Sequence, residues 1–328
     1  MFNNKIERKV KMKKIIIILS TYNGEIYLKE QLDSLFNQSY KNIEIYVRDD
    51  CSKDKTLDVL KLYPIKLINS TNNLGAKNGF SELLSIALNV SDGDYFMFCD
   101  QDDVWDSYKV EKTLDKMLET EFCNPNLPVL IHTDLEVVDK NLNSISQSMW
   151  IYEDIRPEYN SFSRLIMQNT ITGCTVMINK ELAYKSMPVA KNAVMHDWWI
   201  GLVASYFGKI EYLKESTIKY RQHDNNTIGA KNNKNINFIR LAVSLLVSLL
   251  KNIILHENRY LKDLEINRLQ AQAFYEQYEK ELDKKTKDML IEFSNIEQMN
   301  FFKRRFIIYK NKLFKQSTIN NLILWVKI

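Results

Sequence analysis

Three carboxylates stand directly after a short apolar run. The run Tyr95–Cys99 has the composition of a buried strand, and Asp100, Asp102 and Asp103 follow it at once. In an extended chain, residues two apart point the same way, so the carboxylates of Asp100 and Asp102 can converge on one cation. A hard divalent ion held by one or two carboxylates and by substrate phosphates is the usual arrangement of Mg²⁺ in proteins. The spacing therefore indicates a site for a divalent cation, Mg²⁺ or Mn²⁺.

The same residues also have an ordinary structural interpretation. Asp103 can cap a helix that we expect to begin at Val104, and Asp106 would stabilise its first turn. That interpretation leaves Asp100 and Asp102 unused. Because open α/β sheets bind their ligands at the carboxyl ends of strands, a binding role is favoured for these two residues.

Two other expected strands end in polar residues. Asp49 and Asp50 follow the run 43–48, although Asp50 and Ser52 could instead cap the next helix. The first strand ends in the run 20–23, STYN, where neither a G-x-G-x-x-G nor a G-x-x-x-x-G-K-[ST] cradle is present. A sheet with carboxylates at two strand ends and without a glycine cradle needs a metal ion to hold phosphates.

The elements that position these residues alternate along the first two thirds of the chain. Strand-like and helix-like patterns follow one another, which predicts parallel βαβ units and an α/β fold. We expect strands at 14–19, 43–48, 65–69, 95–99 and 129–132, a further segment at 174–179, and helices at 27–37, from 52, at 78–89, from 104 and from 198.

The composition excludes several classes of protein. The 328 residues, 45% of them hydrophobic, can bury a full core, and about two domains are expected at roughly 150 residues each. The net charge of +4 is small and gives no reason to expect nucleic acid as a partner. The four cysteines lack CxxC spacing, so we expect reduced thiols in a cytoplasmic protein. No stretch approaches the ~20 apolar residues of a membrane-spanning helix.

The last third of the chain has a different character. Residues 231–237 are polar and predict a linker, whereas 238–328 contain no Gly or Pro and predict helices throughout. We therefore expect one domain at 13–230 and a helical region at 236–328. Segment 238–255 is apolar nearly all round, which favours a buried helix over an interfacial one. The basic aromatic runs FFKRRF and NNLILWVKI suit an anionic membrane surface, and packing within the protein is the alternative.

Several ordered motifs resemble one enzyme family. The stretch IIIILSTYNGEIYLKEQLDSLFNQSYKNIEIYVRDDCSKDKT resembles the opening of family 2 glycosyltransferases, which have the GT-A fold. The motifs DQDDVW, HDWW and YRQHDNNTIG resemble the rhamnosyltransferase-like branch, which builds bacterial surface polysaccharides. The resemblance covers roughly residues 13–230 and implies a Rossmann-like mixed sheet of the kind found in nucleotide-diphospho-sugar transferases.

The resemblance implies a nucleotide site at the first strand ends. Ser20 and Tyr22 match positions that line the base, and Asp50 matches the residue that accepts the pyrimidine N–H. Lys77 and Asn78 match a segment placed near the diphosphate, where relatives often have Arg. The lysine keeps the charge but lacks the planar fork of a bidentate phosphate contact.

The remaining matches concern the metal and the reaction. Asp100 would lie near the ribose, and Asp102 would be the metal ligand together with His223. Arg221 could neutralise phosphate. Asp197, in MHDWW, matches the catalytic base, and a helix beginning there would lower the pKa of its carboxylate, although an ordinary N-cap fits the same position.

Four further residues are expected to contact the acceptor or phosphate: His196, Trp198, Trp199 and Gly173. Tryptophan rings pack well against sugar faces, although we expect one of the two to lie in the core. The glycine would allow a close approach to the backbone or simply mark a bend. A lone histidine is often a structural residue.

The resemblance implies inverting, metal-dependent transfer of a sugar from a nucleotide-diphosphate donor. The donor to test first is dTDP-rhamnose, and the acceptor would be a hydroxyl of a surface polysaccharide or a lipid-linked glycan. Two alternatives stand: a nucleotidyltransferase acting on sugar phosphates, which would need a Gly-rich basic loop after the first strand, and a catalytically silent assembly partner. The expected location is the cytoplasm, including the inner face of the membrane, and homo-oligomerisation stays open.

Overall fold

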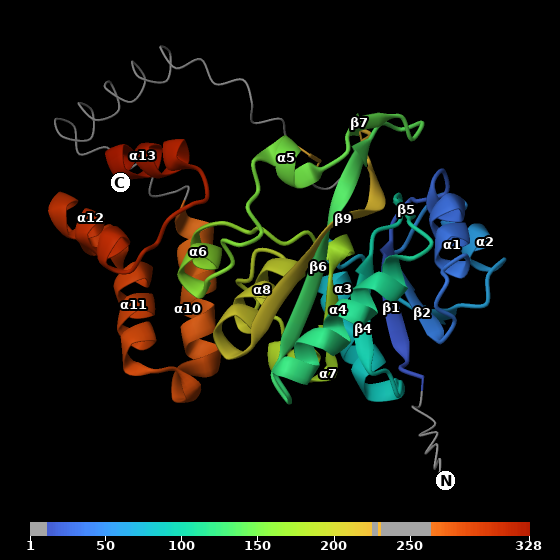
Figure 1. The fold of residues 1–328 in the computed structure, drawn as a ribbon, viewed down its shortest axis with the longest axis horizontal. Helices are drawn as coiled ribbons and strands as arrows, with labels where there is room; N and C mark the ends of the chain where they lie inside the picture. The colour runs from blue at the N-terminus through green and yellow to red at the C-terminus, as the bar shows by residue number, and fades with distance from the viewer. Residues whose placement is uncertain (1–11, 225–228, 231–263) are drawn as a thin grey trace, which may run out of the picture.

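A mixed sheet forms the centre of the computed structural model, which describes residues 12–224, 229–230 and 264–328 (Figure 1). The strand order is β3-β2-β1-β4-β8-β6-β9-β5, and β7 pairs with β6. The strands are β1 (Ile15–Thr21), β2 (Ile43–Asp49), β3 (Lys66–Ile68), β4 (Tyr95–Cys99), β5 (Val104–Trp105), β6 (Val129–Val138), β7 (Ser144–Ser146), β8 (Met177–Asn179) and β9 (Lys209–Arg221). Strands β3, β2, β1 and β4 are parallel, and β8 is antiparallel to both β4 and β6. The predicted Rossmann-like mixed α/β sheet is confirmed.

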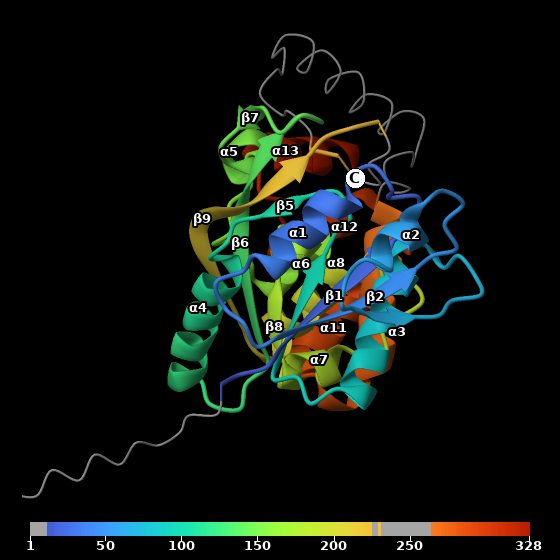
Figure 2. The same cartoon turned by 90° about the vertical axis from the view of Figure 1, so that its right-hand side faces the viewer.

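Helices cover both faces of this sheet, as the positions of α3 and α4 in Figure 2 show. The helices before the C-terminal region are α1 (Leu28–Phe36), α2 (Thr56–Leu60), α3 (Gly75–Val90), α4 (Lys109–Cys123), α5 (Met149–Glu153), α6 (Phe162–Met167), α7 (Lys180–Ser186) and α8 (His196–Phe207). Side chains alternate between the two faces along a strand. Ile16 and Ile18 of β1 therefore join the core under α3, α7 and α8, whereas Ile15 and Ile17 join the core under α1 and α4.

The parallel register brings the predicted polar strand ends to one edge of the sheet. Leu19 of β1 lies beside Cys99 of β4, and Thr21 lies beside Asp49 of β2. The turns that follow these three strands therefore meet at a single edge. This is the edge at which open α/β sheets bind their ligands.

The expected helix at Val104 is wrong. Val104 and Trp105 form strand β5, which pairs antiparallel with Lys219 and Ile218 of β9, and α4 begins only at Lys109. Asp103 is completely buried, and its carboxylate accepts the backbone N–H of Arg221 at 3.1 Å instead of capping a helix. Pairing with a strand distant in sequence therefore prevails over the local capping signal.

Four α-helices follow in the described part of the C-terminal region: α10 (Glu265–Tyr278), α11 (Lys284–Ser294), α12 (Phe301–Lys310) and α13 (Thr318–Lys327). They agree with the helical prediction for that part, whereas the expected linker at 231–237 and helix at 238–255 lie outside the described residues. The Phe274 side chain of α10 is fully buried and contacts Trp199 of α8 and Phe162 of α6. Helix α10 thus shares one hydrophobic core with the sheet domain. Among the described helices, none is long and apolar enough to cross a bilayer.

Candidate functional site

A carboxylate and an imidazole meet where β9 ends beside the turn after β4. Asp102 Oδ2 and His223 Nε2 lie 2.9 Å apart, and both side chains are mostly buried. The imidazole is stacked on the ring of Tyr27, with ring centroids 4.8 Å apart. A carboxylate oxygen and an imidazole nitrogen are ligands that Mn²⁺ and similar divalent ions accept in proteins, and phosphates or water can complete the shell. The two residues expected to bind metal are therefore together and fit such an ion.

Arg221 holds this pair in place. Its guanidinium, 2% exposed, donates to the backbone oxygen of Asp102 at 2.8 Å and to that of Lys140 at 2.7 Å. It also pairs with the Glu30 carboxylate at 2.5 Å and stacks over Tyr27. The expected phosphate contact is not supported, because these donors already bind backbone and carboxylate groups. Arg221 instead fixes the turn that carries Asp102.

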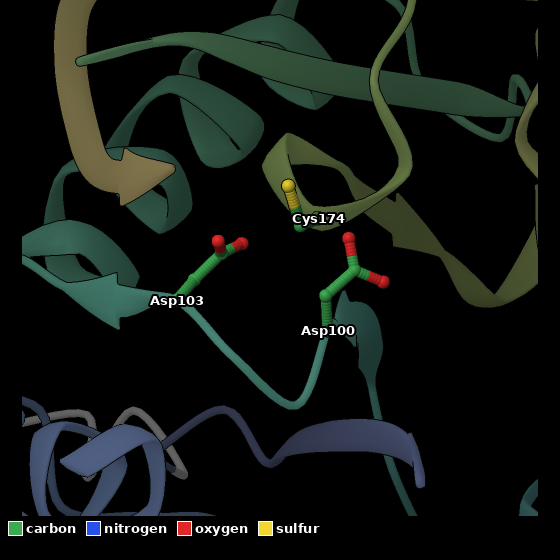
Figure 3. Close-up of side chains that lie close together, drawn as sticks. All are labelled: Asp100, Asp103 and Cys174. Carbon is green, nitrogen blue, oxygen red and sulfur yellow. The ribbon is translucent and has the colours of Figure 1, made fainter. Parts of the chain in front are cut away.

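A second cluster lies deeper, where Asp100, Asp103 and Cys174 converge (Figure 3). Their ligand-type atoms lie within 4.8 Å of one another. Burial and the neighbouring carboxylates raise the pKa of Asp100 to about 7, and burial holds the pKa values of Asp103 and Cys174 well above their usual ranges. Asp103 and Cys174 are almost fully buried, so substrate phosphates cannot share a cation with them. A nucleotide-bound cation fits better at Asp102 and His223.

Gln101 connects the turns after β1 and β4. Its side-chain oxygen accepts the backbone N–H of Tyr22 at 2.8 Å, and its amide donates to the Tyr22 carbonyl at 3.1 Å. A Cβ on Gly24 would lie 2.5 Å from the same amide oxygen, so a larger residue there would displace the Gln101 side chain from Tyr22. Sequence reasoning missed this residue, although its place between the aspartates of DQDD was a signal.

The nucleotide-site residues lie around this edge. Asp50 is 3% exposed, pairs with Arg48, and accepts the backbone N–H groups of Leu74 at 2.8 Å and Gly75 at 2.7 Å. It therefore anchors the loop before α3 and does not cap α2, whose N-cap residue, Lys55, makes no side-chain cap hydrogen bond.

Ser20 and Tyr22 border the same edge in different ways. Ser20 Oγ lies 3.0 Å from where a Cβ on Gly79 would be, so only glycine leaves this hydroxyl undisturbed. The Tyr22 side chain is 47% exposed. An exposed ring at a strand end is available to stack on a base, and the nucleotide-lining role of both residues stays a prediction.

Lys77 and Asn78 lie in the first turn of helix α3, and neither side chain is free for a phosphate in this structure. Lys77 Nζ donates to the carbonyl oxygens of Lys191 at 2.8 Å and Ala193 at 3.0 Å. The Asn78 side chain donates to its own helix at Leu74. The ammonium of Lys77 thus ties α3 to the loop that leads into α8.

Asp197 lies in the first turn of α8, as expected. Its carboxylate accepts the backbone N–H of Trp198 at 2.7 Å, and hydrogen bonds from the Gly173 backbone and the Asn169 side chain also reach it. Burial nevertheless raises the pKa of Asp197 to about 6. The prediction that the helix N-terminus lowers this pKa is wrong in its net sign, because desolvation is the larger effect. Nothing in the sequence pointed to Asn169.

The loop before α8 is held from two sides. Lys77 contacts it from α3, and the Gln270 side chain of α10 accepts the backbone N–H of Val194 at 2.8 Å. Gln270 is fully buried, so this hydrogen bond is shielded from water. The C-terminal helices therefore help to fix the loop that delivers Asp197.

The other residues expected near the acceptor separate into two groups. Trp199 is completely buried and donates its indole N–H to Ser186 O at 3.0 Å, so it is a core residue and not an acceptor contact. His196 is buried against Phe80 and Phe98, burial lowers its pKa to about 3, and neither ring nitrogen has a hydrogen-bond partner among the described residues. It is likewise a packing residue.

Gly173 and Trp198 stay at the site. A Cβ on Gly173 would lie 3.5 Å from Asp197 Oδ2, which places this backbone directly beside the carboxylate. Trp198 is partly exposed, and its indole N–H donates to Leu165 O. Contact of either residue with an acceptor stays a prediction.

The fold and the geometry of the sheet edge define a GT-A-like α/β protein with a mostly buried carboxylate–imidazole pair, Asp102 and His223. The sequence model of glycosyl transferase family 2 matches residues 16–182, and the chain belongs to that family. It is therefore a glycosyltransferase that uses a nucleotide-sugar donor, which sets aside both the nucleotidyltransferase and the silent-partner alternatives.

Named relatives and a solved structure are similar along much of the chain. The dTDP-rhamnosyl transferase RfbG of Shigella flexneri is 29% identical over 65% of this chain and 74% of its own length. TuaG of Bacillus subtilis, a glycosyltransferase named for teichuronic acid biosynthesis, is 28% identical over 66% of this chain and 82% of its own. The crystal structure of S. aureus TarS 1–349 with UDP-GlcNAc matches 96% of this chain and 90% of that one, at 16% identity and a TM-score of 0.53. This likeness shows the fold alone.

Proposed function

We propose that the protein is an inverting glycosyltransferase in which Asp197 is the catalytic base and the Asp102–His223 pair holds a divalent cation. The observation that carries the proposal is that Asp197 and Asp100 border the same turn: a Cβ on Gly173 would lie 3.5 Å from Asp197 Oδ2, and the sulfur of the next residue, Cys174, lies within 4.8 Å of the Asp100 carboxylate. A base and a donor-binding carboxylate are thus near each other but on different elements, α8 and the end of β4. Inverting transfer needs such a base on the face of the sugar opposite the leaving nucleotide.

The chain's own groups account for proton and charge movements. Asp197 takes the proton of the acceptor hydroxyl as its oxygen bonds to the anomeric carbon. The bond from that carbon to the diphosphate oxygen breaks, and the nucleoside diphosphate leaves with the electron pair. A divalent cation at Asp102 and His223 would supply Lewis-acid stabilisation of the diphosphate charge. The backbone N–H of Trp198 and the amide of Asn169 keep the base oriented.

The donor we propose is dTDP-rhamnose. The resemblance of DQDDVW, HDWW and YRQHDNNTIG to rhamnosyltransferases supports it, as does the similarity to RfbG. UDP-sugars are the second candidates, since TarS shares the fold and is named as a complex with UDP-GlcNAc. A panel of dTDP- and UDP-sugars, with release of the nucleoside diphosphate as readout, separates the two.

The acceptor we propose is a hydroxyl of a bacterial surface polysaccharide or of a lipid-linked precursor. Similarity to RfbG and TuaG supports this class of acceptor. Nucleotide sugars are cytoplasmic metabolites, so a lipid-linked acceptor would bring the enzyme to the inner face of the membrane. Homo-oligomerisation is a separate proposal, and size-exclusion chromatography with light scattering tests it.

The test compares Asp102→Ala and Asp197→Asn with Asp115→Ala, an exposed aspartate on α4. We expect both site variants to lose nearly all nucleoside diphosphate release and the control to keep it. EDTA should abolish the release, and Mn²⁺ or Mg²⁺ should restore it. Unchanged turnover in either site variant, or in EDTA, would remove that residue or the cation from the mechanism.

A further inference from the structure

Helix α12 carries an exposed aromatic stripe. Phe302, Phe306 and Tyr309 are 79%, 62% and 75% exposed. At 3.6 residues per turn they lie within an arc of about 60° on one side of the helix. Leu322 and Trp325 of α13 are 52% and 51% exposed. Soluble proteins rarely leave so much aromatic surface in contact with water without a function for it.

The stripe is held rigidly by the buried side of its helix. Ile307 and Ile308 face the core, at 1% and 3% exposure. Asn300 caps the helix by accepting the backbone N–H of Lys303 at 2.9 Å. The aromatic side chains therefore project from a fixed helix, and their exposure is not that of a frayed end.

Arg304 and Arg305 join α12 to the end of α13. The guanidinium of Arg305 donates to Val326 O at 3.2 Å and lies over the rings of both Phe301, at 3.4 Å, and Trp325, at 5.4 Å. Arg304 donates to Ile328 O, directly after α13, at 3.5 Å, and to Glu297 O, before α12, at 2.8 Å. Both arginines are mostly buried and hold α13 beside α12; the ribbon in Figure 1 shows the two helices as neighbours.

The charge of this surface has one sign. Residues 298–328 contain five Lys residues, the buried Arg304 and Arg305, and no Asp or Glu. Lys303 and Lys310 project on one flank of the aromatic stripe, about 80–100° around the helix from Phe302. Lys310 also reaches Glu292 of α11 at 3.1 Å, whereas Lys303 is exposed. Aromatic rings flanked by lysines are typical of helices that lie in the headgroup region of anionic bilayers.

We propose that the face formed by Phe302, Phe306, Tyr309, Leu322 and Trp325 docks on an anionic lipid bilayer. The aromatic rings would enter the headgroup level, and the lysines would contact the lipid phosphates. A second copy of this chain fits less well, because its own face would bring lysines of the same positive charge against Lys303 and Lys310. Docking on the membrane would bring the enzyme to a lipid-linked acceptor, and this role rests on the proposed function.

The experiment uses the full chain and flotation with vesicles of phosphatidylcholine, with and without phosphatidylglycerol. The triple variant Phe302→Ser, Phe306→Ser, Tyr309→Ser removes the stripe, and Phe122→Ser, at an 89% exposed ring of α4, is the matched control. We expect the wild-type protein and the control to float with anionic vesicles, and the triple variant to bind at least tenfold more weakly. Lys303→Glu should weaken binding to anionic vesicles and leave the weak binding to neutral ones unchanged.

Three outcomes would overturn the proposal. The wild-type protein could fail to bind either kind of vesicle. The triple variant could instead bind as well as the wild type, and any membrane contact would then lie elsewhere in the chain. Alternatively, light scattering could show that the wild-type protein is an oligomer and the triple variant a monomer, and the face would then join copies of this chain. Circular dichroism checks that the variants fold. Nucleoside diphosphate release with a soluble acceptor is read in parallel, so failure of the proposed chemistry and failure of membrane docking give different results.

Discussion

The proposed base, Asp197, limits the pH range in which the enzyme can work. Burial raises its pKa to about 6, against hydrogen bonds from Trp198, Gly173 and Asn169 that lower it. The base must be ionised to accept a proton, so the rate follows the ionised fraction. With this pKa, about one carboxyl in ten is ionised at pH 5, and turnover should fall about tenfold between pH 8 and pH 5. An ordinary aspartate would lose only about a tenth of its activity over that range.

Asn169 supplies a second, independent perturbation. Its side-chain hydrogen bond favours the ionised form of Asp197, and Asn169→Ala removes it. The acidic limb of the profile should therefore move to higher pH. Asn192→Ala, an exposed amide in the loop before α8, is the matched control and should leave the profile unchanged.

The assay is nucleoside diphosphate release at saturating donor, acceptor and Mn²⁺ across the pH range. Because the pKa of Asp100 is raised to about 7, donor binding also depends on pH and is measured separately by calorimetry at each point. Saturation then leaves the chemical step as the source of the acidic limb. A profile that stays flat down to pH 5, or an unmoved midpoint in Asn169→Ala, would refute the assignment of the base.

Further predictions concern stability and positioning. Asp197 ionises at about pH 4 in the unfolded chain and only at about pH 6 in the folded chain, so the stability of the folded state falls as the pH rises through that window. In thermal melts, Asp197→Asn should therefore raise Tm at pH 7 and leave it unchanged at pH 4. Arg221→Lys removes the guanidinium that holds the turn of Asp102 and should weaken Mn²⁺ binding about 10–100-fold, measured by calorimetry with nucleoside diphosphate present. An unchanged affinity would show that this turn keeps its conformation without Arg221. Gln270→Ala removes the buried acceptor of the Val194 N–H, which should cost about 1 kcal/mol of unfolding free energy. The variant should have a lower kcat and an unchanged KM for the donor. An unaltered kcat would mean that α10 does not position Asp197.

The strands and their polar ends could be predicted from the sequence because their signals are local. Residues 15–19 are apolar throughout, and such a run is buried on both faces whichever neighbours it pairs with. Carboxylates directly after parallel strands must reach the same edge once the strands pair. The prediction of a cation site there started from Asp100 and Asp102, whereas the partner that the structure gives Asp102, His223, lies 121 residues further along the chain.

Distant contacts decided the rest. Asp103 and Val104 match a helix start, but β9 pairs with this segment and Arg221 offers its N–H to the buried carboxylate. Trp198 and Trp199 are adjacent and identical in type, yet the helix turns one of them toward Phe274 in the core. A local pattern cannot distinguish them, because the partner that buries Trp199 lies 75 residues further along the chain.

The sequence by itself determined the family, the α/β class and the aspartates at the sheet edge, since propensity, hydrophobic runs and ordered motifs are properties of neighbouring residues. Only the tertiary structure decided that Arg221 supports the turn of the Asp102–His223 pair, that α10 holds the loop before Asp197, and that the pKa of Asp197 is raised and not lowered. Each of these depends on burial and on donors from remote segments. The burial of a carboxylate and the identity of its hydrogen-bond donors are fixed only when the chain folds, and no single stretch of residues encodes them.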